Sequence, residues 1–303
     1  YAAACKAVYS GSIPDSASNN IMKVGIVGYG FVGKALREGL NDDVEILKID
    51  PKLNTSIKDL KKFSPDVIFV CLPTPMLEDG NQDISIVTDT IMEIKKLNIS
   101  ALVVLKSTIH PGNMSSIKNM YPKVVYNPEF LREKHAKEDF INSELIIFGG
   151  DEKASSALAK IYSSFTKCIN KDYIFTDAIT ASMIKYTINS FLATKVIFFN
   201  EINSIFQSVD AQESWEDFTK ILSRDTRIGD SHMMVPGHDG RFGFGGACLP
   251  KDINALVKFA ENINLELNLL KTVIKTNNKI RASYNSNTHR EDEQNINYNN
   301  LKE

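Results

Sequence analysis

Buried-strand patterns alternate with helical patterns along the first half of the chain. The apolar runs at 22–27, 44–49, 66–72, 101–105, 123–126 and 145–148 are predicted strands, and the patterns at 34–40, 84–97 and 151–167 are predicted helices. The run at 66–72 is continuously apolar, which is typical of a parallel strand covered on both faces. This alternation predicts an α/β fold, a Rossmann-type doubly wound sheet over residues 21–177.

The second half of the chain shows helical patterns only. Between residues 178 and 209 no proline or glycine interrupts an apolar pattern, which predicts a helix about 48 Å long at the usual rise per residue. A helix of this length joins two units, so we expect a connecting helix followed by an all-α dimerisation domain that extends to residue 281. Its shorter helices are predicted at 213–223, 251–260 and 265–281, and Trp215 is expected to be a packing residue.

Both ends of the chain are polar. Residues 1–20 lack the basic start and the apolar run of a signal peptide, so we expect a disordered arm or a cloning remnant. Residues 282–303 contain few apolar side chains, and we expect a polar tail that buries no core.

The composition argues against several classes of function. The formal net charge of the 303 residues is −2 and the lysines are scattered, so no basic face indicates nucleic acid, and no stretch is long enough to span a membrane. The four cysteines, Cys5, Cys71, Cys168 and Cys248, form neither a CxxC pair nor a His-Cys cluster, which argues against a metal site and against disulfides. We therefore expect a cytoplasmic protein without a metal, in which Cys71 is a core residue of a strand.

A glycine motif follows the first predicted strand. Gly28, Gly30 and Gly33 form GxGxxG between a strand and a helix. In this context the first glycine makes a tight turn, the second lets a pyrophosphate approach, and the third lets the helix pack on the strand. The second strand ends at Asp50, close to the spacing of about 20 residues at which a carboxylate binds a ribose 2′-hydroxyl. Because an acid there repels a 2′-phosphate, the motif predicts NAD rather than NADP.

Polar residues also follow the next strands. The strand at 66–72 stops at Pro73, Thr74 and Pro75, and the strand at 101–105 is followed by Thr108. Ligands of doubly wound sheets lie beyond the carboxyl ends of the strands, so these residues should line the cofactor crevice. His110 precedes a proline, and a turn residue is a better interpretation of it than a catalytic base.

Two acids and two residues of the long helix are candidates for the reaction site. If the segment from residue 128 is helical, Glu129 and Glu133 share one face and Glu129 can act as a base on water; solvated surface glutamates are the alternative. Lys185 and Asn189 are four apart on one helix face and can stabilise an oxyanion near a thiol. The alternative is a lysine that reaches solvent beside a capping amide.

The residues around Cys248 carry the clearest chemistry. Residues 242–252 read Phe-Gly-Phe-Gly-Gly-Ala-Cys-Leu-Pro-Lys-Asp, so three glycines free the backbone before a single thiol. Lys251, or a helix beginning near Pro250, would lower the pKa of the thiol and favour the thiolate, and Asp252 can position a proton or a water. A buried, inert cysteine is the alternative, because most free cysteines are of that kind.

Together these motifs resemble those of the UDP-glucose/GDP-mannose dehydrogenase family over residues 22–281. The matching elements are Gly-Tyr-Gly-Phe-Val-Gly at 28–33, Cys-Leu-Pro-Thr-Pro at 71–75, Ser-Thr at 107–108, Asn-Pro-Glu-Phe-Leu-Arg-Glu at 127–133, Lys185 with Asn189, and Phe-Gly-Gly-Ala-Cys-Leu-Pro-Lys-Asp at 244–252. The resemblance implies that two NAD molecules in succession oxidise the C6 alcohol of a nucleotide sugar to a carboxylate, UDP-glucose being the family's commonest substrate. The alternatives are UDP-N-acetylmannosamine or GDP-mannose oxidation, a two-electron hydroxyacid dehydrogenase, and a non-catalytic sugar-nucleotide sensor.

The resemblance also implies roles for individual residues. Cys248 would carry a thiohemiacetal and then a thioester. The other catalytic groups would stabilise the oxyanion (Lys185, Asn189), hold water (Asp252, Thr108) or act as general base (Glu129). Implied cofactor contacts are Gly28, Gly30, Phe31, Val32, Gly33, Asp50, Pro73, Thr74, Pro75, Thr108 and Glu133. Implied substrate contacts are Glu129, Phe130, Leu131, Arg132, Lys185, Asn189, Arg227, Phe244, Gly245 and Gly246, with Arg227 reaching phosphate across a homodimer interface. Family members usually carry a further α/β domain, so the resemblance implies either a compact natural form or a truncated one, and the loop before Cys248 can supply contacts that this domain would make.

Overall fold

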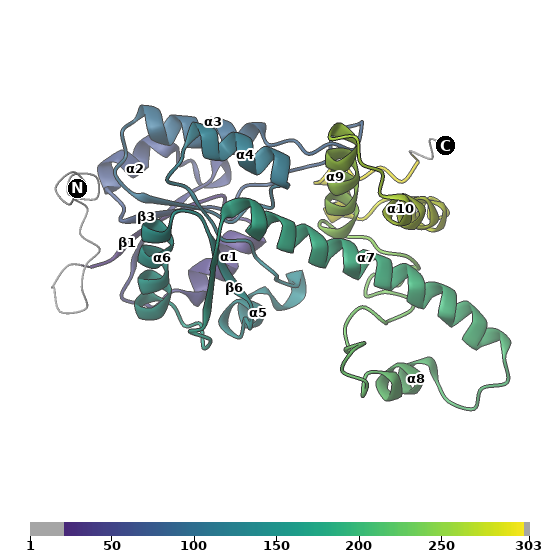
Figure 1. Cartoon of the computed structure of the whole chain (residues 1–303). Helices are drawn as coiled ribbons and strands as arrows, with labels where there is room; N and C mark the ends of the chain where they lie inside the picture. Colours follow the sequence, from purple (N-terminus) through teal and green to yellow (C-terminus); the bar gives the residue numbers. More distant parts are fainter. Residues whose placement is uncertain (1–20, 300–303) are drawn as a thin grey trace. The chain divides into compact units, whose positions relative to one another are not determined.

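The computed structural model describes residues 21–299, which form two compact units (Figure 1). The first unit contains the residues up to Thr74 together with Ile84–Lys185, and the second contains Pro75–Asp83 and the residues from Tyr186 onward. Residues 1–20, for which the sequence predicts a disordered arm, lie outside the described part of the chain.

A seven-stranded sheet forms the centre of the first unit. Its order is β2-β1-β3-β4-β5-β6-β7, and paired strands are parallel except for β5 and β6, which are antiparallel. The strands are β1 (Lys23–Val27), β2 (Glu45–Ile49), β3 (Val67–Val70), β4 (Leu102–Leu105), β5 (Val125–Tyr126), β6 (Ile146–Gly149) and β7 (Tyr173–Thr176). All residues of β3 and β4 are apolar and buried, as in strands covered on both faces. The predicted α/β sheet is confirmed.

Helices cover both faces of this sheet (Figure 1). On one face lie α2 (Ile57–Phe63), α3 (Ser85–Lys96) and α4 (Pro111–Met120), and on the other lie α1 (Phe31–Gly39), α5 (Ala136–Ile141) and α6 (Glu152–Phe165). Each face has its own hydrophobic core, and the second contains the fully buried rings of Phe69 and Phe148. Burial of one such side chain stabilises a fold by about 1.5–3 kcal/mol.

A close approach at Gly149 fixes the start of the helix α7 (Ala178–Ser208). A Cβ built on Gly149 would lie 2.6 Å from the Cβ of Ala181, so only glycine leaves room for the first turn of α7 against β6. Ser182, the next residue of the helix, donates to the carbonyl oxygen of Ile109 at 2.6 Å. These two contacts hold the beginning of α7 on the sheet.

The second unit is helical. The helix α7 continues through it to Ser208, as the pattern at 178–209 predicts. The other helices are α8 (Trp215–Leu222), α9 (Leu249–Asn262), α10 (Asn268–Arg281) and α11 (His289–Asp292). The ring of Trp215 lies 5.5 Å from that of Phe206 and 5.3 Å from that of Phe218, measured between ring centres, which confirms its packing role.

The segment after α10 differs from the expected polar tail. Residues 282–299 contain α11, and every second position from 294 to 298 is buried. The side chains of Ile296 and Tyr298 thereby join an apolar cluster of the second unit. The low apolar content of this segment concealed the alternation in the sequence. The buried Glu291 is tolerated because it forms an ion pair with Arg281.

Candidate functional site

The glycine motif forms a tight turn between β1 and α1. Gly28 has a φ of 87°, and a Cβ on it would lie 2.6 Å from the carbonyl oxygen of Cys71. A Cβ on Gly33 would clash with the carbonyl of Gly28. Among the described residues nothing lies within 4 Å of a Cβ built on Gly30, so a ligand can approach the backbone there. The N-terminus of α1 lies directly after this turn, and the partial positive charge of a helix N-terminus suits a pyrophosphate.

Asp50 lies beside this turn at the end of β2. One carboxylate oxygen accepts from the N–H of Tyr29 at 2.8 Å, and the other accepts from the N–H of Lys52 at 2.9 Å. The side chain is therefore fixed next to the glycine turn, where dinucleotide folds place the carboxylate that binds a ribose. The turn and the acid together fit NAD, whose nicotinamide accepts a hydride when bound.

A hydrogen bond joins the residues that follow β3 and β4. The hydroxyl of Thr74 donates to the carbonyl oxygen of Thr108 at 3.0 Å, and both residues are buried. Pro73 is exposed, and Pro75 belongs to the second unit. His110 accepts from two N–H groups as the N-cap of α4, and burial lowers its pKa to about 4. A neutral capping imidazole agrees with the predicted turn residue.

A buried ion pair joins Glu129 to α7. The ammonium of Lys185 lies 2.5 Å from the carbonyl oxygen of Glu129 and 3.5 Å from a carboxylate oxygen, and the two side chains are 4% and 5% exposed. The other carboxylate oxygen accepts from the N–H of Leu131 at 2.7 Å. Lys185 also lies 5.2 Å from the centre of the Phe130 ring. The first unit thus brings a candidate base and a candidate oxyanion donor into contact.

The condition that the segment from residue 128 is helical is not met. The segment from residue 127 to residue 132 is not helical, and a 3-10 turn, η2 (Glu133–His135), precedes α5. Asp139 accepts from both the backbone and the side chain of Arg132, and the Glu129 carboxylate binds a backbone N–H two residues on. These side-chain contacts take the place of helical hydrogen bonds. Glu133 is exposed and does not share a helix face with Glu129.

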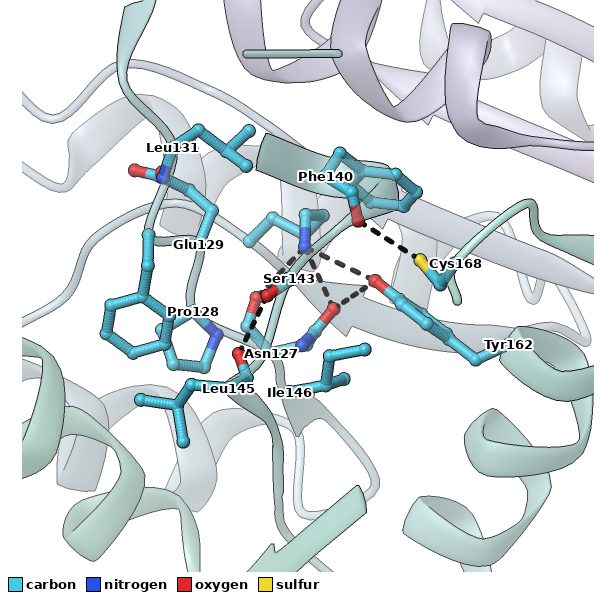
Figure 2. A pocket seen from close by; sticks show the side chains of 12 residues that line it. Asn127, Pro128, Glu129, Leu131, Phe140, Ser143, Leu145, Ile146, Tyr162 and Cys168 are labelled. Carbon is cyan, nitrogen blue, oxygen red and sulfur yellow. Dashed lines mark hydrogen bonds between the residues drawn. The ribbon is translucent and has the colours of Figure 1, made fainter. Parts of the chain in front are cut away.

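Glu129 also lines a small pocket of the first unit (Figure 2). On its wall, the ammonium of Lys106 lies 2.9 Å from the amide oxygen of Asn127, which also accepts from the hydroxyl of Tyr162 at 2.5 Å. Burial lowers the pKa of Lys106, whose hydrogen bonds within the described part of the chain go to neutral acceptors. Sequence reasoning missed Lys106, and its position directly after β4 was the available signal.

In the second unit, Cys248 occupies the N-cap position of α9. Its thiol is half-buried, and the partial positive charge of the helix N-terminus favours a negative charge there. Asp252, in the first turn of α9, is 1% exposed and accepts from the amide of Asn189 at 2.6 Å. The ammonium of Lys251 lies 2.5 Å from its other carboxylate oxygen. Lys251 and Asn189 therefore both contact Asp252, in the first turn of the helix that begins after Cys248.

Two other predicted substrate contacts of the second unit are Phe244 and Arg227. The Phe244 side chain is buried in an apolar cluster with Ala193 and Ile197, and its backbone N–H and carbonyl oxygen bond to the side chain of Asn277. Arg227 lies on the surface, where its guanidinium pairs with Asp225 at 2.6 Å. Among residues 21–299, no group of three or more acidic, His or Cys side chains is arranged for a metal ion. No helix in the same range combines the length and the apolar character that a membrane span needs.

Both halves of the chain match domains of one protein family. Residues 37–166 match the NAD-binding domain of the UDP-glucose/GDP-mannose dehydrogenase family, and residues 179–279 match its central domain. A UDP-glucose 6-dehydrogenase of Rickettsia prowazekii (strain Madrid E) is 34% identical over 86% of this chain and 68% of its own length. The UDP-glucose 6-dehydrogenase YwqF of Bacillus subtilis (strain 168) is 37% identical over 72% of this chain and 49% of its own length.

Solved structures share the fold. A UDP-glucose dehydrogenase from the archaeon Pyrobaculum islandicum superposes with a TM-score of 0.70 at 24% identity, over 88% of this chain and 70% of that chain. The 3-hydroxyisobutyrate dehydrogenase of Mycobacterium tuberculosis superposes with a TM-score of 0.63 at 16% identity, over 93% and 98% of the two chains. At these identities the likeness establishes the architecture alone.

Proposed function

Because the chain belongs to the UDP-glucose/GDP-mannose dehydrogenase family, we propose that it oxidises the C6 alcohol of a nucleotide sugar to a carboxylate, with NAD as hydride acceptor. UDP-glucose is the substrate we propose, since the relatives named above are UDP-glucose 6-dehydrogenases. The observation that carries this proposal is the thiol of Cys248 at the start of α9, with the buried Asp252 one turn on. A dehydrogenase that stops after one oxidation has no use for such a thiol.

The proposed route runs through covalent intermediates on Cys248. After the first hydride leaves C6, the thiolate adds to the aldehyde carbon and forms a thiohemiacetal. Loss of the second hydride from that carbon gives a thioester, and attack of water breaks the C–S bond and releases the thiolate. One alcohol, two NAD⁺ and one water thus give one carboxylate, two NADH and three protons.

The remaining site residues supply charge stabilisation and proton transfer in this route. Lys185 and Asn189 donate to the oxyanion that forms at C6 in the addition and hydrolysis steps. Glu129 removes a proton from the attacking water. Its contact with the Lys185 ammonium holds the Glu129 side chain in position for this step. Asp252 holds Asn189 and orients water. A reducing cytoplasm is the setting we propose, because the chemistry needs a free thiol.

The number of hydrides transferred tests the proposal. We expect two NADH for each UDP-glucose consumed, with UDP-glucuronate as product, when limiting sugar is treated with excess NAD and absorbance is followed to completion. One NADH per sugar would instead indicate a two-electron hydroxyacid-type dehydrogenase, which the fold also accommodates. Binding without any NADH would indicate a sugar-nucleotide sensor. Parallel reactions with UDP-N-acetylmannosamine and GDP-mannose identify the preferred sugar.

We also propose a homodimer that pairs through α7. Phe191, Phe198 and Ile205 are 63%, 54% and 60% exposed and recur every seven residues, so they form one apolar face of the helix. Phe198→Glu is expected to convert the dimer to a monomer, because it places a charge in the middle of this face, as sedimentation velocity would show. Leu53→Glu, an exposed apolar position of the first unit, is the matched control. A monomeric parent protein at micromolar concentration would contradict the proposal.

A further inference from the structure

Side chains from two helices hold the beginning of the glycine loop that precedes Cys248. The N–H of Gly243 donates to the amide oxygen of Asn200 on α7 at 2.9 Å. The N–H of Phe244 donates to the amide oxygen of Asn277 on α10 at 2.7 Å. Because these donors lie in a loop, side chains provide the acceptors that a helix or sheet would otherwise supply.

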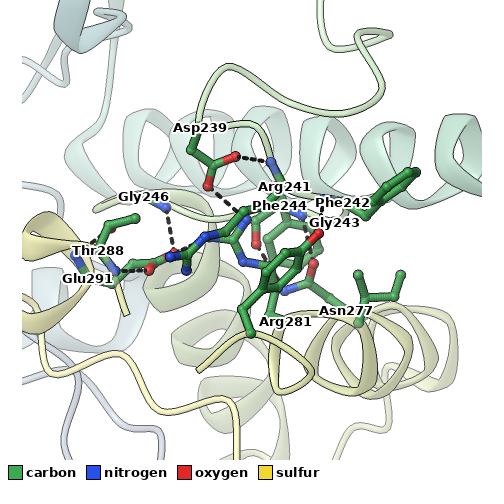
Figure 3. Close-up of polar contacts among 12 residues, drawn as sticks. Asp239, Arg241, Phe242, Gly243, Phe244, Gly246, Asn277, Arg281, Thr288 and Glu291 are labelled. Carbon is green, nitrogen blue, oxygen red and sulfur yellow. Dashed lines mark hydrogen bonds and ion pairs between the residues drawn. The ribbon is translucent and has the colours of Figure 1, made fainter. Parts of the chain in front are cut away.

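The end of the same loop is held by a carboxylate from α11. The N–H of Gly246, two residues before the thiol-bearing residue, donates to Glu291 at 3.2 Å. The same oxygen of Glu291 accepts from Arg281 and from the hydroxyl of Tyr298, each at 2.6 Å. Arg281 in turn lies between Glu291 and Asp239 (Figure 3), and its guanidinium is 2.8 Å from Asp239. The loop end therefore rests on a buried ion-pair network.

The charge state of Glu291 suits this role. Burial alone would raise the pKa of Glu291, but the N–H of Thr288, the hydroxyl of Tyr298 and the charge of Arg281 together bring it below its ordinary value. The carboxylate is thus ionised at neutral pH. A hydrogen bond from Gly246 to an ionised acceptor is stronger than one to a neutral group.

Gly245 brings the loop into direct contact with the ion pair. A Cβ on Gly245 would clash with both the Arg281 guanidinium and the Glu291 carboxylate. Gly246 has a φ of 79°, in the region that favours glycine. The conformation of the backbone that leads to Cys248 is therefore shaped by charged groups of α10 and α11.

The segment that contains Glu291 also binds another part of the second unit. The N–H of Met76 donates to the carbonyl oxygen of Gln294 at 3.0 Å, and Met76 packs with Ile296 and Tyr298. Apolar packing and a backbone hydrogen bond thus anchor the segment independently of the ion pair. Loss of the Glu291 charge alone should leave the segment folded in place.

We propose that Glu291 and Arg281 are positioning residues that hold the Gly245-Gly246 backbone, and through it the thiol of Cys248, in the orientation needed for attack on C6. The proposal rests on the proposed function for its chemistry. Its physical basis is that a reacting atom displaced by about 1 Å costs on the order of 100-fold in rate. Neither residue touches the reacting atoms, so both act through the loop.

Glu291→Gln tests the proposal because it keeps the shape of the side chain and removes its charge. We expect kcat for UDP-glucose oxidation to fall about 10- to 100-fold while KM for NAD stays within about twofold. Two further readouts do not depend on turnover. Hydrogen exchange at the Gly246 amide should become faster, and the alkylation rate of Cys248 by iodoacetamide, followed by peptide mass spectrometry, should change at least about threefold.

Glu293→Gln is the matched control, since Glu293 lies two residues away and pairs with Arg290 at the surface. It should leave kcat, exchange at Gly246 and alkylation of Cys248 unchanged. Parent-like values of all three in Glu291→Gln would overturn the proposal. So would a fall in kcat together with faster alkylation of the buried Cys168, because that pattern means general unfolding.

A second variant tests the proposal if Glu291→Gln folds poorly. Tyr298→Phe removes one hydroxyl donor from Glu291 and leaves the ion pair intact. We expect faster exchange at Gly246 and a smaller fall in kcat, and unchanged values in a folded Tyr298→Phe would overturn the proposal. If the parent protein makes no NADH, the proposed function fails, while exchange and alkylation still decide whether the ion pair holds the loop.

Discussion

Cys248→Ser is expected to lower the rate of uronic acid formation at least about 10³-fold. A serine hydroxyl is a weak nucleophile at neutral pH, and no thioester can form without the sulfur. The first hydride transfer does not use the thiol, so traces of NADH and aldehyde are compatible with this result. Chromatographic detection of UDP-glucuronate at saturating UDP-glucose and NAD measures the effect.

Cys168→Ser is the control for this substitution. Cys168 is 4% exposed and its sulfur lies 3.3 Å from the carbonyl oxygen of Phe140, so it belongs to the core of the first unit. Burial raises the pKa of the Cys168 thiol, which keeps it protonated and unreactive. This variant should form the acid at the parent rate. An undiminished rate in Cys248→Ser would refute the covalent step.

Asp252→Ala is expected to destabilise the second unit by about 3–5 kcal/mol and to abolish activity. The substitution removes the carboxylate that lies 2.5 Å from the buried Lys251 ammonium and that accepts from the amide of Asn189. Removal of one member of a buried ion pair is costly because the protein interior solvates the remaining charge poorly. Urea unfolding followed by fluorescence reports this unit, since Trp215 is the only tryptophan and lies within it.

Glu261→Ala provides the comparison on the same helix. Glu261 pairs with Lys258 and Lys271 at 3.0 Å, but these side chains are 33% to 38% exposed. Surface pairs of this kind contribute at most about 1 kcal/mol, so stability and activity should change little. Equal losses in the two variants would mean that Asp252 is no more than another surface acid.

The local sequence was sufficient to predict the dinucleotide turn and the long helix. The backbone at Gly28 takes a positive φ, which glycine favours, and the Asp50 carboxylate accepts from the N–H of Lys52, two residues on. Interactions between near neighbours in the chain therefore determine both positions. The helix α7 was equally readable, because an apolar pattern without proline or glycine leaves few other conformations.

Side chains that bind backbone groups were the main source of error. The acids Glu129 and Asp139 take N–H groups that a helix would have used, and the helix considered from residue 128 onward did not include this competition. The acceptors of the glycine loop escaped notice for a different reason. Asn200 lies 43 residues from Gly243, and Glu291 lies 45 residues from Gly246, so no periodic window contains both partners.

The absence of a side chain at Gly149 governs the electrostatics of the Glu129–Lys185 pair. Any larger residue there would push the first turn of α7 outward from β6, since Ala181 already fills the space. Lys185 lies one turn beyond Ala181 and would move with the helix. An ammonium and a carboxylate drawn apart inside a protein each lose their counter-ion, and both buried charges then become costly. The contact between the proposed base and its ammonium partner thus depends, in part, on a residue that carries no polar side-chain atom.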